Sequence, residues 1–256
     1  MANLTAARGK VSGAWVWTAL AAGLRVGALA AGALALTAAA VAALPTPPSG
    51  ARANPASVDT HDVRSIARAV DEHYNRLRTL QAEFTEIYRG AGAERTESGS
   101  LWLKKPGKMR WEYRSPREKV FVSDGKDAWF YVPGDRQARK TPARQLDDLR
   151  SPLGFLLGKT RLEKELDGLS FAPDVAPAVA GDVVLRGVPT ALADRVSEVL
   201  LETTPEDRIT RIVLEEVDGA VTEYRFREER ENVAVGDERF HFRPPVGVET
   251  IDEDVR

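Results

Sequence analysis

Residues 101–113 decide the fold class and read Leu101-Trp102-Leu103-Lys104-Lys105-Pro106-Gly107-Lys108-Met109-Arg110-Trp111-Glu112-Tyr113. After the Pro-Gly pair, apolar Met109, Trp111 and Tyr113 alternate with charged residues. A period of two is the period of a β-strand, whose successive side chains point to opposite faces. The charged positions, Lys108, Arg110 and Glu112, are expected to face water. The apolar positions predict a sheet that curls around a core or a cavity.

The same alternation recurs on both sides of this stretch. Leu80, Ala82 and Phe84 begin it, and turn signals such as Asp124-Gly125 and Asp218-Gly219 separate close neighbours. Turns of this length join antiparallel strands. The sequence therefore predicts a mainly antiparallel sheet. Its further strand candidates are residues 100–105, 108–113, 119–122, 128–132, 182–185, 197–203, 210–217, 221–229 and 239–243.

Two helices are predicted beside the strands. From residue 60 to residue 80 apolar residues recur every three or four positions, which indicates one amphipathic helix. In residues 151–158, Ser151 is placed to cap a short helix, Pro152 to begin it and Gly158 to end it. This second helix is apolar on nearly every side and too short to be stable alone. It must cover an apolar surface or be covered by one.

The first 53 residues are predicted to be a signal peptide. They hold basic residues, no acidic residue and an apolar run over residues 26–44. The small-residue pattern Ala51-Arg52-Ala53 predicts cleavage before Asn54. Because the apolar run approaches the ~20 residues that span a bilayer, a retained N-terminal anchor is the alternative. Residues 54–256 are expected to form one domain.

Composition excludes several classes of function. The chain has 256 residues, a formal net charge of −2 and no cysteine. Nucleic acid is therefore not an expected partner, and disulfides, thiolate metal sites and cysteine nucleophiles are ruled out. His61, His73 and His241 lack the spacing of a helical zinc site, and no nucleophile or phosphate-binding motif occurs. We expect no catalytic residue, metal or cofactor.

Three tryptophans, Trp102, Trp111 and Trp129, are crowded into a short part of the chain. They either fill a core or line a cavity for a hydrophobic ligand. Periodicity does not separate these two readings.

Four motifs, in order, resemble the LolA family of lipoprotein carriers. Residues 101–113 resemble its LWxKRP segment and the aromatic strand that follows. Residues 122–126, Val-Ser-Asp-Gly-Lys, and residues 129–131, Trp-Phe-Tyr, are similar to its VSDGK hairpin and WFY strand. Residues 151–157 resemble its TPFxLL helix. Residues 240–248, Phe-His-Phe-Arg-Pro-Pro-Val-Gly-Val, resemble its FxFxPPxGV ending.

The resemblance implies an α+β fold: an unclosed, mainly antiparallel β-barrel with a helical lid over an apolar cavity. The expected function is a monomeric periplasmic carrier that takes acylated lipoproteins from an inner-membrane ABC transporter to an outer-membrane receptor lipoprotein. Lys105 stands where the family has an arginine that fastens the lid, so it is a candidate latch, although lysine lacks the planar fork of arginine. The implied cavity wall is Leu101, Leu103, Met109, Trp111, Phe121 and Trp129, and the implied lid residues are Leu153, Phe155, Leu156 and Leu157.

Two alternatives remain. Related folds occur in periplasmic sensors that regulate an envelope stress response, although such sensors usually carry a further C-terminal domain and this chain ends soon after Val248. The second alternative is that the protein carries another lipid.

Overall fold

The computed structural model describes residues 62–143, 156 and 161–252. The predicted signal peptide lies outside these residues, as does all of the predicted helix at 151–158 except Leu156.

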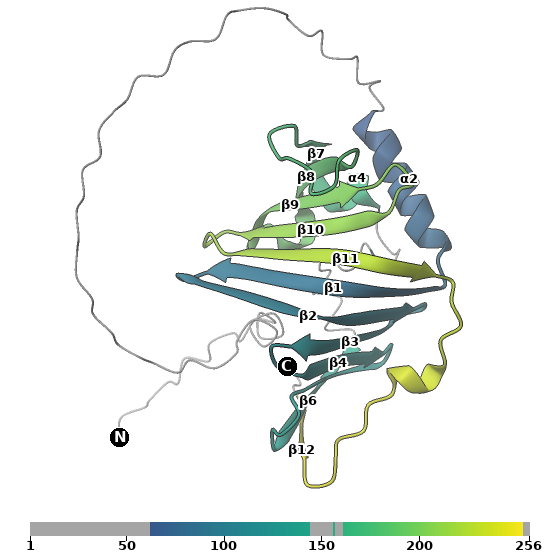
Figure 1. Cartoon of the computed structure of the whole chain (residues 1–256), viewed down its shortest axis with the longest axis vertical. Coiled ribbons are helices and arrows are strands. Elements are labelled where there is room, and N and C mark those ends of the chain that lie inside the picture. The colour runs from purple at the N-terminus through teal and green to yellow at the C-terminus, as the bar shows by residue number, and fades with distance from the viewer. Residues whose placement is uncertain (1–61, 144–155, 157–160, 253–256) are drawn as a thin grey trace, which may run out of the picture. The chain divides into compact units, whose positions relative to one another are not determined.

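The described residues form one sheet of twelve strands, in the order β12-β6-β5-β4-β3-β2-β1-β11-β10-β9-β8-β7 (Figure 1). All neighbours are antiparallel except β12 and β6, which are parallel. The end strands β12 and β7 do not pair, so the sheet is unclosed, and the predicted fold class is confirmed. The strands are β1 (Thr79–Gly90), β2 (Ala93–Lys104), β3 (Lys108–Ser115), β4 (Lys119–Asp124), β5 (Asp127–Tyr131), β6 (Gln137–Pro142), β7 (Leu166–Phe171), β8 (Val183–Pro189), β9 (Val196–Thr203), β10 (Ile209–Glu216), β11 (Val221–Glu231) and β12 (Glu249–Asp252).

Register assigns each side chain to a face. Leu101 pairs with Trp111, and Trp111 pairs with Phe121. Direct partners lie on the same face, so these three residues share one face, which we call the inner face. The other face is the outer face. The inner face runs on through β1, β11, β10, β9 and β8 with Phe84, Phe226, Tyr224, Ile212, Leu201 and Leu185.

The N-terminal helix α2 (Val63–Arg76) lies along the ends of β10 and β11 (Figure 1). The side chain of Asp62 caps it by accepting from the backbone N–H of Arg64. Its apolar stripe, Ala67, Val70 and Tyr74, is buried. This helix lies within the predicted span of 60–80. Two 3₁₀ helices, η2 (Thr190–Leu192) and η3 (Asp237–Phe240), and the one-turn helix α4 (Leu162–Glu165) complete the described elements.

The strand predicted at residues 239–243 is wrong. Its first residues belong to η3, and the rest is extended chain without a ladder. Phe240 is fully buried, and Phe242 packs against Trp129 and Tyr131 at ring-centroid distances of 5.5 and 5.6 Å. The alternation of Phe240 and Phe242 therefore reflects docking of this segment on the sheet and not strand pairing.

The same segment corrects the expectation that the charged side of β3 faces water. Asp237 forms ion pairs with Lys104 at 2.6 Å and Lys108 at 3.0 Å. Arg110 donates to the carbonyl oxygen of Arg239 over 3.0 Å. The guanidinium of Arg239 lies 4.4 Å from the ring centroid of Trp102, on the outer face. The C-terminal segment therefore covers the outer face of β2 and β3.

Candidate functional site

The inner face carries an aromatic cluster at its centre. The ring of Phe84 lies 4.7 Å from that of Trp111 and 4.8 Å from that of Tyr113, both edge-on. Trp111 in turn lies 6.0 Å from Tyr224 and 6.5 Å from Phe226. Such T-shaped pairs place the positive ring edge against a negative ring face. Strands β1, β3 and β11 thus supply one contiguous aromatic surface.

Five of the six predicted wall residues share this inner face. Leu101, Trp111 and Phe121 form one cross-strand row, and Leu103 and Met109 form the next. Four of these residues are buried, and Met109 is partly exposed. Neighbouring rows are about 7 Å apart because each strand residue adds about 3.4 Å.

Trp129 lies elsewhere. It pairs with Val122, which pairs with Arg110, so Trp129 is on the outer face. There it packs against Phe242, and the ammonium of Lys140 lies 5.7 Å from its ring centroid. Its neighbour Phe130, the partner of Phe121, takes the inner-face position. A wall on the inner face therefore does not include Trp129.

Lys105 binds α2. Its Nζ donates to the carbonyl oxygen of Tyr74 over 2.5 Å and to that of Asn75 over 3.1 Å. These carbonyls lie in the last turn of α2, where a cation is favoured by the helix dipole. Partial burial lowers the pKa of Lys105. The residue predicted to fasten a lid thus holds the N-terminal helix.

Of the predicted lid residues, Leu156 is helical and buried, and Leu153, Phe155 and Leu157 lie outside the described residues.

The inner face also holds charged residues that the sequence analysis did not single out. Glu86, Glu97 and Lys119 are buried, and Lys119 contacts Glu97 at 2.6 Å. Tyr113 donates from its hydroxyl to Glu86 over 2.7 Å. Burial raises the pKa of Glu86 to about 7. The sequence contained a signal for the inward position of Glu86, because Glu86 continues the alternation of the inward-facing residues Ala82 and Phe84.

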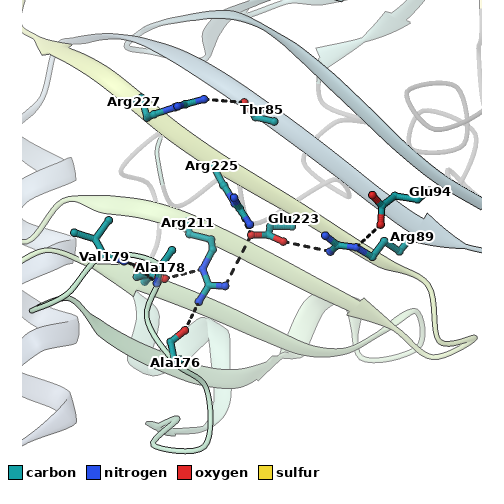
Figure 2. Close-up of polar contacts among 11 residues, drawn as sticks. Thr85, Arg89, Glu94, Ala176, Ala178, Val179, Arg211, Glu223, Arg225 and Arg227 are labelled. Carbon is teal, nitrogen blue, oxygen red and sulfur yellow. Dashed lines mark hydrogen bonds and ion pairs between the residues drawn. The ribbon is translucent and has the colours of Figure 1, made fainter. Parts of the chain in front are cut away.

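A second charged network lies on the outer face (Figure 2). Arg211 forms ion pairs with Glu202 at 2.6 Å and with Glu223 at 3.8 Å. Buried Glu202 also accepts from the backbone N–H groups of Ala178 and Val179, so it holds the connection after β7 against the sheet. Arg225 and Arg89 lower the pKa of Glu223 against the opposing effect of burial. These contacts are structural and lie away from the aromatic cluster.

Two features are absent from the described part of the chain. No helix there is long and apolar enough to cross a membrane. Its acidic and histidine residues form no group of three that could hold a metal ion.

The fold is an unclosed, mainly antiparallel sheet with an apolar inner face and an N-terminal helix, and this architecture defines the class of protein as a LolA-like fold. The chain belongs to the LolA family, because the family model described as outer membrane lipoprotein carrier protein LolA matches residues 75–243. An outer-membrane lipoprotein carrier protein of Nitrosospira multiformis is 30% identical over 181 residues, covering 69% of this chain and 83% of that protein. One of Dechloromonas aromatica is 30% identical over 192 residues, covering 73% and 89%. A LolA superfamily protein of Nitrosomonas europaea matches as a solved structure with a TM-score of 0.40, 14% identity, and coverage of 70% and 97%.

Proposed function

We propose that this protein binds the acyl chains of lipoproteins on its inner face and carries them, as a monomer, from the inner to the outer membrane. Membership of the LolA carrier family carries the proposal. The in-register row of Leu101, Trp111 and Phe121 supports it, because an apolar surface of this kind suits acyl chains. Each buried methylene contributes about 0.8 kcal/mol, so no catalysed reaction is needed for binding.

Release of the acyl chains requires that the cover over the inner face opens. We assign this cover to α2 together with the segment of residues 151–158. Buried Leu156 supports this role, and so do the bonds from Lys105 to the last turn of α2. Apolar lid residues that refill the site when it is empty would lower the net affinity for cargo and permit transfer.

The proposed compartment is the periplasm, with residues 1–53 as a cleaved signal peptide. The proposed donor is an inner-membrane ABC transporter, and the proposed acceptor is an outer-membrane receptor lipoprotein. N-terminal sequencing of the protein recovered from the periplasm of a Gram-negative host should begin at Asn54. Recovery of residues 26–44 in the membrane fraction would contradict a soluble shuttle.

Mass spectrometry of material that copurifies with the tagged protein tests the function itself. We expect acylated lipoproteins in a complex with one carrier chain. Two tryptophans provide a matched pair: Trp111 lies on the inner face and Trp102 on the outer face, and both are buried. Trp111→Leu should reduce the copurified lipoprotein several-fold more than Trp102→Leu. Phospholipid as the main bound species, or equal effects of the two substitutions, would contradict the proposal.

A further inference from the structure

The inner face changes from apolar to charged within one step along each of three strands. On β1, Phe84 is followed on this face by Glu86, and on β4, Phe121 is preceded by Lys119. On β2 the inner-face series is Leu103, Leu101, Gly99 and then Glu97. Since Glu86 pairs with Glu97 and Lys119 pairs with Tyr113, the charges lie at the same end of the sheet. We call Glu86, Glu97, Tyr113 and Lys119 the polar end cluster.

The cluster is buried and bonded internally. Lys119 lies 2.6 Å from Glu97, and its ammonium is 4.1 Å from the ring centroid of Tyr113. Tyr113 donates to Glu86 over 2.7 Å. All four side chains are less than 9% exposed. Burying an ion pair seldom adds net stability compared with apolar residues of similar volume, so stability does not account for this cluster.

At the opposite end, β1 and β2 keep the inner face apolar as far as Leu80 and Leu103, and on β11 Glu231, the partner of Leu80, contacts His73 of α2. Glu97 lies six positions before Leu103 on β2, which corresponds to about 20 Å of strand. Along this distance β1 contributes Leu80, Ala82 and Phe84 to the same face. The apolar surface therefore has a defined length, bounded by α2 and Lys105 at one end and by the polar end cluster at the other.

We propose that the polar end cluster is the end wall of the acyl-binding surface and limits the length of the acyl chain that the protein accepts. The inference rests on the proposed function and adds a specificity-determining role for these four residues. A methylene buried against the apolar rows improves binding about fourfold. One that reached Glu86 or Glu97 would instead displace groups that are already hydrogen-bonded, and an apolar chain offers no replacement for those bonds.

Binding of a series of saturated fatty acids, from myristic through palmitic, stearic and arachidic to behenic acid, tests the proposal on the full chain. Affinity of the parent protein should rise with chain length and then stop rising. Two variants remove the wall in whole pairs: Glu97→Leu with Lys119→Leu, and Glu86→Leu with Tyr113→Phe. Each should move the limit to a longer acid and tighten binding of the longest acids by at least about tenfold, as expected for two or more added methylenes.

The control is Glu83→Gln with Arg114→Gln, which removes an outer-face ion pair from β1 and β3. It should leave the chain-length limit unchanged. Thermal unfolding checks each variant, and if one double variant does not fold, the other decides. An unchanged limit in a folded variant that still binds palmitic acid would overturn the end wall while leaving the carrier function intact. Failure of the parent protein to bind any acid would overturn both.

Discussion

Lys105 donates from Nζ to the carbonyl oxygen of Tyr74 over 2.5 Å, which joins the turn between β2 and β3 to the last turn of α2. The helix is held at this end by further contacts with the sheet. Ile209 donates its backbone N–H to the Tyr74 hydroxyl over 2.8 Å, and His73 contacts Glu231 at 2.9 Å. Asp71 accepts from the backbone N–H of Leu162 and so ties α2 to α4.

Lys105→Met should loosen α2. The substitution removes a cationic donor from two carbonyl oxygens, which costs about 1–2 kcal/mol of unfolding free energy. Lys105→Arg should restore most of the loss because its guanidinium also donates to carbonyl oxygens. Urea unfolding and hydrogen exchange of the α2 amides measure both variants. Identical protection of α2 in the Met variant and the parent would show that the bond does not hold the helix.

Leu156→Asp should speed ligand exchange more than it lowers global stability. Leu156 is buried, and under the proposed function it belongs to a cover that opens locally at small free energy. A fluorescent fatty-acid analogue reports the exchange rate, and urea unfolding reports stability. Loss of the whole fold would instead identify Leu156 as ordinary core.

Glu229 should make the protein less stable as pH rises. Neither of its carboxylate oxygens has a hydrogen-bond partner among the residues that the structure describes, and both are buried. Burial, followed by the neighbouring Glu231, raises the pKa of Glu229 from 4.5 to about 7. The folded protein thus holds this proton more tightly than the unfolded chain. The stabilising contribution is complete below pH 4.5 and is lost as pH rises through about 7.

Glu229→Gln removes this titration. At about pH 8 the variant should be more stable than the parent by about 1–3 kcal/mol, and at about pH 5 the difference should be small. Urea midpoints across this range provide the test, with the exposed neighbour Glu228→Gln as the control. Part of the decrease in stability with rising pH should persist in the variant, because the pKa of buried Glu86 is also raised to about 7. A Glu229 variant with the same slope as the parent would refute the assignment.

Gly99→Ala should disrupt the pairing of β2 with β3. A Cβ atom at this position would lie 1.9 Å from the backbone oxygen of Glu112, so the two strands would have to separate. We expect a loss of at least about 2 kcal/mol. Gly92→Ala is the matched control: its φ is +74° but nothing lies within 4 Å of the added Cβ, so the cost should be nearer 1 kcal/mol. Equal urea midpoints for the two variants would contradict the close approach.

The local pattern predicts which side chains face inward wherever apolar and charged residues alternate within one strand. In residues 108–113, apolar and charged residues alternate strictly, and the structure places Trp111 on the inner face beside Leu101, as predicted. Residues 129–131 show no such alternation, because Trp129, Phe130 and Tyr131 are all aromatic, so the sequence does not indicate which of them face inward. Only pairing with β4 showed that Phe130 faces inward and Trp129 outward.

The sequence also does not predict short strands whose formation depends on pairing with segments distant in the chain. Strands β6, β7 and β12 are not predicted by the local pattern, because charged or polar residues break their alternation. The spacing of Phe240 and Phe242 predicts a strand that the structure does not contain, because a docked extended segment and a paired strand have the same period.

The sequence alone thus determined the class of the fold, the family and the inward residues of β2 and β3, because these depend on local periodicity and on motifs contiguous along the chain. The tertiary structure decided which face each ambiguous aromatic occupies, what covers the outer face and where the inner face becomes charged. It also showed that Lys105 holds a helix 30 residues away. These properties depend on which segments distant in sequence meet, and no local pattern specifies such contacts.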